Sequence, residues 1–164
     1  MSSLESPFAA TDPDRLAIWQ MLVTRDTDAY LSRDWQAVAE DFVEEGFFGI
    51  DARRDPNPAQ WRIAYPSLAL YREEWLRQAA QTAQSADQAR ARTAFLDAVT
   101  LDDIKIDGSF ALAHKIFNGR LPNRDGSHET LDWQTLYVCR RNAGRWKIAS
   151  FVGYMSRTAQ VTPR

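Results

Sequence analysis

The spacing of apolar residues changes near residue 93, and this change limits the chain to a fold that combines helices with a sheet. Before residue 93, apolar residues recur at every third or fourth position, which is typical of amphipathic helices. After it, apolar and polar residues alternate, as in strands with one buried face. The pair Asp107-Gly108 and the run Asn142-Ala143-Gly144 are turn sequences that join antiparallel strands. This order predicts the α+β class, with helices on one face of a curved, mainly antiparallel sheet.

Three helices are expected in the N-terminal half of the chain. Asp12 can cap the first helix and Pro13 suits its first position, while Ser67 can cap the third. The predicted helices cover residues 13–32, 35–42 and 68–84. Residues 85–92 are polar, which fits either a frayed helix end or a loop.

Five strands are expected, and the first lies between helices. Residues 47–52 have strand composition, and residues 52–66 contain three prolines and are predicted to form a long loop. The other strands are predicted at Thr93–Ile106, Phe110–Leu121, Glu129–Arg141 and Arg145–Ser156. A chain of 164 residues fits one domain. We therefore expect a single domain at 14–156, a flexible arm at 1–13 and a tail at 157–164.

Composition argues against several classes of partner. Twenty basic and 22 acidic residues give a net charge of −2, so there is no electrostatic reason to expect binding to nucleic acid or to an anionic membrane. No segment approaches the roughly 20 apolar residues of a membrane span, and the N-terminus does not resemble a secretory signal. We expect a cytoplasmic protein.

The sequence also lacks the usual cofactor motifs. Two distant histidines and a single cysteine, Cys139, do not form a zinc-binding set, and no glycine-rich phosphate loop is present. We therefore expect no metal and no cofactor, and Cys139 is interpreted as a buried apolar residue.

Asp26 is the first candidate for chemistry because of its place on the first helix. Helical geometry puts it on the apolar face, among Trp19, Leu22, Val23 and Tyr30. A buried carboxyl in apolar surroundings can act as a general acid or base. The structural alternative is that Asp26 lies at the helix edge or pairs with an arginine from another element.

Aromatic residues are the candidates for binding a ligand. Six Trp, eight Phe and five Tyr are more than a small core requires, so some are expected to line a cavity. The candidate ligand-binding residues are Trp19, Tyr30, Tyr71, Trp133, Tyr137 and Tyr154. Alternation places Trp146, Ile148, Ser150, Val152 and Tyr154 on one face of the last strand.

Residues on two of the predicted strands have more than one interpretation. His114 shares a face with Phe110, Leu112 and Ile116, where it is either a packed core residue or a proton-transfer group. In the next strand, Trp133, Thr135, Tyr137 and Cys139 share one face, and the opposite face, with Leu136 and Val138, is also apolar. Both faces of a sheet that is apolar on both sides must be covered, one by the helices and the other by a second copy of the chain. This predicts a homodimer.

Three segments resemble the nuclear transport factor 2-like superfamily, in particular its SnoaL-like branch. They are SRDWQAVAEDF at 32–42, FVEEGFFGID at 42–51 and the terminal hairpin YVCRRNAGRWKIASF at 137–151. The resemblance covers residues 14–156. It implies a cone-shaped, cystatin-like fold and a homodimer formed through the outer face of the sheet. It also implies that Asp51, near the end of the first strand, is a general base and that His114 acts as in the dehydratases.

Several activities occur on this fold, so the resemblance leaves the function open. We expect a protein that binds a small apolar or aromatic molecule, with Asp26, Asp51 and His114 as candidate catalytic residues for a cofactor-free isomerase, cyclase or dehydratase. The segment Thr135–Tyr137 holds no acid, which argues against steroid-isomerase chemistry. The alternatives are a non-catalytic binding or protein-interaction module, and an epoxide hydrolase in which Arg120 would supply the cation.

Overall fold

The first long helix consists of three joined segments. The computed structural model describes residues 5–157. The helix comprises α1 (Pro13–Trp19), the π-helical segment η1 (Gln20–Arg25) and α2 (Asp26–Ser32), which confirms the predicted helix. The Asp12 side chain caps it by accepting a hydrogen bond from the Arg15 amide. The short helix α3 (Gln36–Ala39) and the long helix α4 (Leu68–Ser85) follow, and the Ser67 side chain caps α4 as expected.

Two elements differ from the prediction. The segment expected to be one loop contains a 3₁₀ turn, η2 (Pro58–Gln60), and a strand, β2 (Arg62–Tyr65), which pairs with β1 (Phe48–Asp51). The strand expected at 93–106 begins only at β3 (Val99–Asp107), because residues before it form helix α5 (Gln88–Ala98). Asp87 caps α5, and Ala91, Phe95 and Leu96 form its buried side at helical spacing.

The remaining strands form long antiparallel hairpins that agree with the predicted ranges to one residue at their ends. They are β4 (Phe110–Pro122), β5 (His128–Asn142) and β6 (Arg145–Met155). The sheet order is β2-β1-β6-β5-β4-β3. Only the β1–β6 pair among these is parallel. The mainly antiparallel α+β architecture is therefore confirmed.

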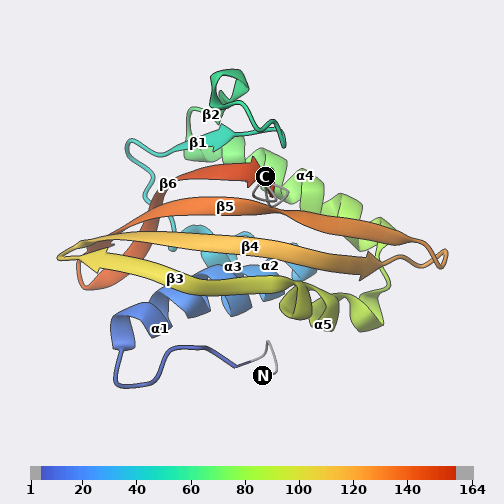
Figure 1. The fold of residues 1–164 in the computed structure, drawn as a ribbon, viewed down its shortest axis with the longest axis horizontal. Coiled ribbons are helices and arrows are strands. Elements are labelled where there is room, and N and C mark those ends of the chain that lie inside the picture. Colours follow the sequence, from blue (N-terminus) through green and yellow to red (C-terminus); the bar gives the residue numbers. More distant parts are fainter. Residues whose placement is uncertain (1–4, 158–164) are drawn as a thin grey trace, which may run out of the picture.

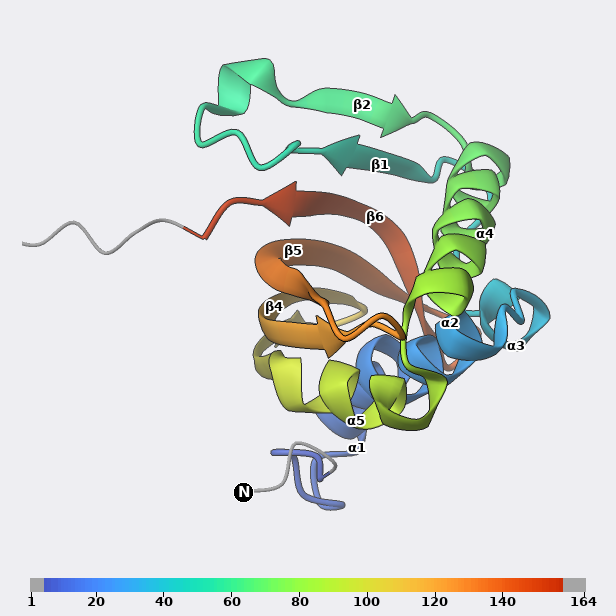
Figure 2. The ribbon, with the colours of Figure 1, turned by 90° about the vertical axis from the view of Figure 1, so that its right-hand side faces the viewer.

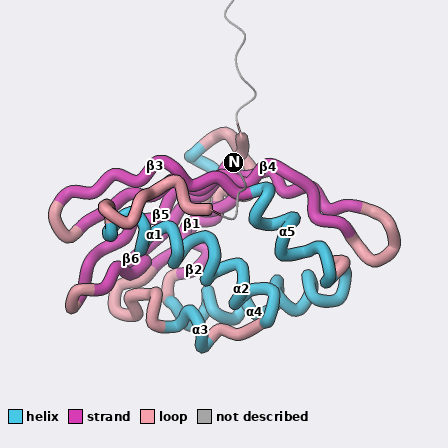
Figure 3. Tube along the Cα trace, turned by 90° about the horizontal axis from the view of Figure 1, so that it is seen from below, coloured by secondary structure: helices cyan, strands magenta, loops and turns pink. Residues whose placement is uncertain are grey.

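The helices gather on one side of the sheet. The strands bend around α1, α2, α4 and α5, so the sheet has a concave face toward the helices (Figures 1 and 2). Viewed from below, the helices form a layer under the strands (Figure 3). No described helix covers the convex face. None of the helices in the described part of the chain is both long and apolar enough to cross a membrane.

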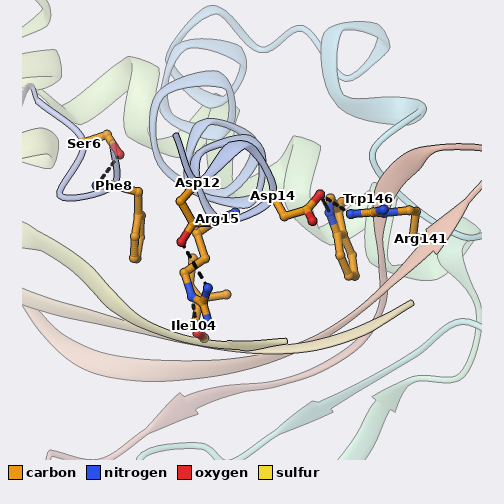
Figure 4. Close-up of polar contacts among 8 residues, drawn as sticks. All are labelled: Ser6, Phe8, Asp12, Asp14, Arg15, Ile104, Arg141 and Trp146. Atoms are coloured by element: carbon orange, nitrogen blue, oxygen red, sulfur yellow. Dashed lines mark hydrogen bonds and ion pairs between the residues drawn. The ribbon is translucent and has the colours of Figure 1, made fainter. Parts of the chain in front are cut away.

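Polar contacts fasten α1 to strands β3, β5 and β6 of the sheet (Figure 4). The Arg15 Nε donates to the Ile104 carbonyl of β3 at 2.8 Å. The Asp14 carboxylate accepts a hydrogen bond from Trp146 Nε1 at 3.0 Å and forms an ion pair with Arg141. The hydrogen bond from Trp146 and the Arg141 charge lower the pKa of Asp14. Residues 1–4 and 158–164 of the predicted arm and tail lie outside the described residues, while Phe8 packs against the core.

Two irregularities in β6 change which of its side chains face the helices. Ala149 is an extra residue between two pairs with β5, and a second shift lies opposite Thr135. A one-residue insertion moves the following side chains to the other face. Ser150 and Val152 therefore leave the face on which simple alternation placed them, and Phe151 reaches the concave side. The second irregularity returns Tyr154 to the concave side.

Candidate functional site

A cavity of about 360 Å³ lies between the concave face of the sheet and the helices. This volume is within the range of about 300–1,000 Å³ that is usual for small-molecule sites. Its walls combine aromatic rings with a few polar groups. The lining includes Asp26, Thr27, Tyr30, Arg54, Tyr65, Tyr71, Trp75, Arg77, Gln78, Phe95, Lys115, Phe117, Glu129, Trp133, Thr135, Tyr137, Phe151 and Tyr154.

A break in the first helix provides a polar group at the cavity wall. In a regular α-helix the amide of Asp26 would bond to the carbonyl of Leu22. In η1 this amide bonds to Val23 instead. The Leu22 carbonyl accepts a hydrogen bond from Lys115 Nζ at 2.5 Å, which crosses from β4. π-Helical turns are frequent at functional sites, and this one receives a buried cation.

Lys115 and Asp26 form an ion pair in the cavity wall. Their Nζ and Oδ2 atoms are 3.1 Å apart. The Lys115 side chain is 2% exposed, whereas the Asp26 side chain is 33% exposed, so the carboxylate is the more accessible partner. The ammonium also lies over the rings of Phe117 and Tyr137, at 5.1 and 6.0 Å from their centres. Asp26 is thus a carboxylate oriented toward the cavity, and its partner is a lysine rather than the arginine considered from sequence.

Tyr71 and Tyr137 bring two phenol groups to the same part of the cavity. Together with Asp26 they also line a smaller hollow behind it. Burial raises the pKa of both phenols well above the ordinary value, and the negative charge of Asp26 raises it further. Neither hydroxyl forms a hydrogen bond with any residue of the described range 5–157. Both are therefore neutral donors available to a ligand.

Two other tyrosines are held by polar side chains of α4. The Tyr30 hydroxyl lies 2.9 Å from Thr82 Oγ1, and the Tyr154 hydroxyl donates to Gln78 Oε1 at 2.9 Å. Burial raises the pKa of both phenols. Tyr154 adopts a left-handed backbone conformation, with φ of 52°, at the second irregularity of β6. These contacts fix the shape of the cavity wall.

The structure brings together only part of the predicted site. Asp26, Tyr30, Tyr71, Trp133, Tyr137 and Tyr154 line the cavity. Trp19 does not, because it packs in the apolar core. The Asp51 carboxylate lies outside the cavity lining and accepts a hydrogen bond from the Arg53 amide at 2.7 Å, within the turn after β1.

His114 lies on the convex face of the sheet, because its neighbours Ala113 and Lys115 face the helices. Its Nε2 lies 2.7 Å from Gln134 Oε1. It therefore cannot reach the Asp26 carboxylate across the sheet. Arg120 lines a separate hollow between α5 and β4, and so does not supply the cation of an epoxide hydrolase in this cavity.

Two further features concern metal binding and the single cysteine. Within residues 5–157, no group of three or more His, Cys, Asp or Glu is placed to hold a metal ion. Cys139 is fully buried, and burial raises the pKa of its thiol to about 12. Such a thiol is protonated at neutral pH and does not act as a nucleophile.

Lys115 and Arg54 are among the cavity residues that were not sequence candidates. A lysine within a strand is normally read as solvent-exposed, although its alternation with Ala111, Ala113 and Phe117 was visible. Arg54 lies in the segment predicted to be a loop, where no periodicity indicates which way a side chain points.

Comparisons with known proteins identify the fold. No protein-family model matches the chain, and no curated protein matches its sequence. Among solved structures, a nuclear transport factor 2-like superfamily protein from Salmonella enterica is 13% identical with a TM-score of 0.59, covering 94% of this chain and all of that one. A protein of this kind from Pseudomonas putida, of unknown function, is 15% identical with a TM-score of 0.58, covering 93% and 92%. A protein from Novosphingobium aromaticivorans, named as a candidate aromatic ring hydroxylase, is 18% identical with a TM-score of 0.55, covering 92% and 91%.

Proposed function

The chain has the nuclear transport factor 2-like fold, and from its cavity we propose that it is a small-molecule-binding protein of the SnoaL-like branch. The ligand is a flat, largely apolar or aromatic molecule that carries a carbonyl group. Aromatic walls fit its flat faces, while Lys115, Tyr71 and Tyr137 offer hydrogen-bond donors to its oxygen. The observation that carries this proposal is the Asp26–Lys115 ion pair in the cavity wall, beside two phenol hydroxyls that form no hydrogen bond within residues 5–157.

The reaction that these groups support is proton transfer without a cofactor. Asp26 would take a proton from the carbon next to the carbonyl, so that the electrons of the broken C–H bond move to the carbonyl oxygen. A donor from Lys115 or Tyr137 would stabilise the resulting enolate. Return of the proton from Asp26 to a different carbon completes an isomerisation. A cyclisation or a dehydration would begin with the same proton abstraction.

The alternative is a non-catalytic binding module. The ion pair itself favours it, because a carboxylate that balances a buried ammonium has a structural reason to be present. Binding of the ligand would then be the whole function.

Hydrogen–deuterium exchange separates the two readings. We would measure exchange at the carbons next to the carbonyl of 1-indanone, 2-tetralone and acetophenone in D₂O by NMR, with binding followed by calorimetry. The catalytic reading predicts exchange faster than in buffer, a rate that Asp26→Asn returns to the buffer value. Asp28→Asn is the matched control, since Asp28 lies two residues away in an exposed ion pair with Arg92.

The outcomes distinguish the hypotheses directly. Binding without accelerated exchange would support the non-catalytic module. Absence of binding for every ketone would contradict the proposed function. Circular dichroism establishes that each variant is folded, and the Lys115→Met variant tests the donor while the Asp26 carboxylate stays in place.

We also propose that two copies pair through the convex face of the sheet. Ile63 and Phe48 are exposed there, and the face also carries Leu112, Ile116, Leu136, Val138 and Val152. An apolar patch of this kind is complementary to itself, which suits a symmetric dimer.

A charge placed on this face tests the dimer. Leu136→Arg is expected to convert the dimer to a monomer in sedimentation experiments, because a guanidinium would be buried without a partner. Gln36→Arg, on the exposed side of α3, is expected to leave the mass unchanged. A monomeric wild-type protein, or a dimeric Leu136→Arg variant, would contradict this proposal.

A further inference from the structure

We propose that Arg54 binds an acidic group of the ligand at the rim of the cavity, so that the ligand is a planar aromatic carboxylate. This inference rests on the proposed small-molecule-binding function and adds the chemical class of the molecule. It depends on how Arg54 is held, on which cations of the cavity already have partners, and on the aromatic surface beside it.

Arg54 presents its guanidinium over an aromatic surface. The guanidinium carbon lies 5.7 Å from the ring centre of Trp133 and 6.0 Å from that of Tyr154. No side-chain hydrogen bond of Arg54 is found within residues 5–157, so its N–H donors are available for a carboxylate. An arginine held in this way keeps its capacity for a two-pronged hydrogen bond with an acid.

The other two cations that line the cavity already have carboxylate partners. Arg77 binds Glu74 through two nitrogens, at 2.7 and 2.5 Å, and Lys115 binds Asp26 at 3.1 Å. Arg54 forms no ion pair with any acidic residue in the range 5–157. Of the three, Arg54 is therefore the cation whose charge is not already balanced by a carboxylate within this range.

The backbone fixes Arg54 in position before any ligand binds. Arg53 and Arg54 both have left-handed conformations, with φ of 54° and 58°, which residues with side chains seldom adopt. Backbone hydrogen bonds tie this turn to β6, from the Arg54 amide to the Tyr154 carbonyl at 2.8 Å and from the Ala52 amide to the Gly153 carbonyl at 2.9 Å. Conformations of this kind persist where the surroundings enforce them, and they cluster at ligand clamps.

The aromatic rings beside Arg54 form a surface that orients the flat face of the ligand. Phe117 and Trp133 are stacked at 4.6 Å, and Trp133 contacts Tyr154 at 5.4 Å. These rings connect Arg54 to Lys115, which lies over Phe117. Glu129 lies four residues from Trp133 along β5, a distance of about 13 Å in an extended strand, so its charge is displaced from the Arg54 side. A planar acid would therefore place its carboxylate at Arg54 and its ring along Trp133.

Matched acids and amides test this inference. We would measure, by calorimetry, the binding of benzoate, cinnamate and 2-naphthoate, each compared with its neutral amide. At least one acid is expected to bind about tenfold more tightly than its amide, as a hydrogen bond between charged groups provides. Arg54→Gln is expected to abolish this preference and leave the affinity for the amide unchanged.

Arg53→Gln is the matched control. Arg53 is adjacent, carries the same charge and has the same backbone conformation, but it does not line the cavity. It should keep the preference for the acid. If an amide binds as tightly as its acid, or if Arg54→Gln keeps the preference, the role of Arg54 is wrong while the proposed cavity function stands. If neither acids nor amides bind, the proposed binding of aromatic molecules fails as well.

Discussion

Replacing Asp41 by alanine is expected to lower the free energy of unfolding by about 3 kcal/mol. The Asp41 side chain is 1% exposed and accepts three hydrogen bonds from guanidinium groups. Two come from Arg25, at 2.7 and 2.8 Å, and one comes from Arg145, at 2.7 Å. The substitution would remove the buried acceptor that joins the first helix to the start of β6.

Asp41 lies where the first helix meets β6, so removing its side chain weakens tertiary contacts. Its backbone also pairs with β6, because the Ile148 amide donates to the Asp41 carbonyl at 2.7 Å. The two arginines are partly exposed and can regain water, which keeps the expected cost below the sum of the separate bonds. A loss of this size is a large part of the roughly 5–15 kcal/mol by which a domain is stable.

Urea unfolding followed by circular dichroism measures the effect. Asp28→Ala is the matched control, because it removes an aspartate that pairs with Arg92 while both side chains are about half exposed. Its expected cost is below about 1 kcal/mol, as for other surface pairs. An Asp41→Ala variant as stable as Asp28→Ala would show that the buried network does not stabilise the fold.

Most of the fold was predictable because its signals are local. Asp12 and Ser67 cap helices where their side-chain chemistry indicates, and the turns at Gly108 and Gly144 place the ends of the long strands. Helix α5 was missed because Thr93–Ala98 also fits an alternating pattern over so short a length. Helix and strand periods are distinguished only over longer segments.

Alternation gave the two faces of β4 correctly but did not decide which of them carries the site. Phe110, Leu112 and Ile116 look like the core-facing set because they are large. The helices instead pack closely against Ala111 and Ala113, which are fully buried, and the large residues lie on the convex face. Small side chains allow close approach of a helix, so size alone does not indicate which face is covered. His114 therefore lies on the face away from the helices, and Lys115 on the face that carries the site.

Alternation along β6 places some of its side chains correctly and others on the wrong face. The two irregularities relative to β5 cancel at Tyr154, so it lies on the concave side with Trp146, as simple alternation placed it, while Ser150 and Val152 lie on the convex side. Gly153 is a sequence sign of the second irregularity, because an isolated glycine within a strand is typical of a bulge. Nothing in the sequence marks the extra residue at Ala149, which is determined by pairing with a distant strand. Tyr154 was a sequence candidate for ligand binding, and the structure places its side chain in the cavity lining.

Replacing Asp26 by asparagine is expected to destabilise the protein by about 3 kcal/mol, and replacing Lys115 by methionine in the same chain is expected to restore part of that loss. The Lys115 ammonium is almost completely buried, so without Asp26 its charge is left with the Leu22 carbonyl and two aromatic faces. Methionine has a similar length and carries no charge. In the double variant no buried cation remains, although the Leu22 carbonyl loses its donor.

The single Lys115→Met substitution is expected to destabilise the protein less than Asp26→Asn does. Lys115→Met alone leaves the Asp26 carboxylate, which is one-third exposed and can be hydrated from the cavity, so its expected cost is about 1–2 kcal/mol. Urea unfolding of the wild type, both single variants and the double variant gives the coupling between the two residues. A double variant no more stable than Asp26→Asn would mean that the buried ammonium is satisfied without the carboxylate. Asp26 would then be present for a reason other than balancing Lys115, and its exposure to the cavity would be the remaining explanation.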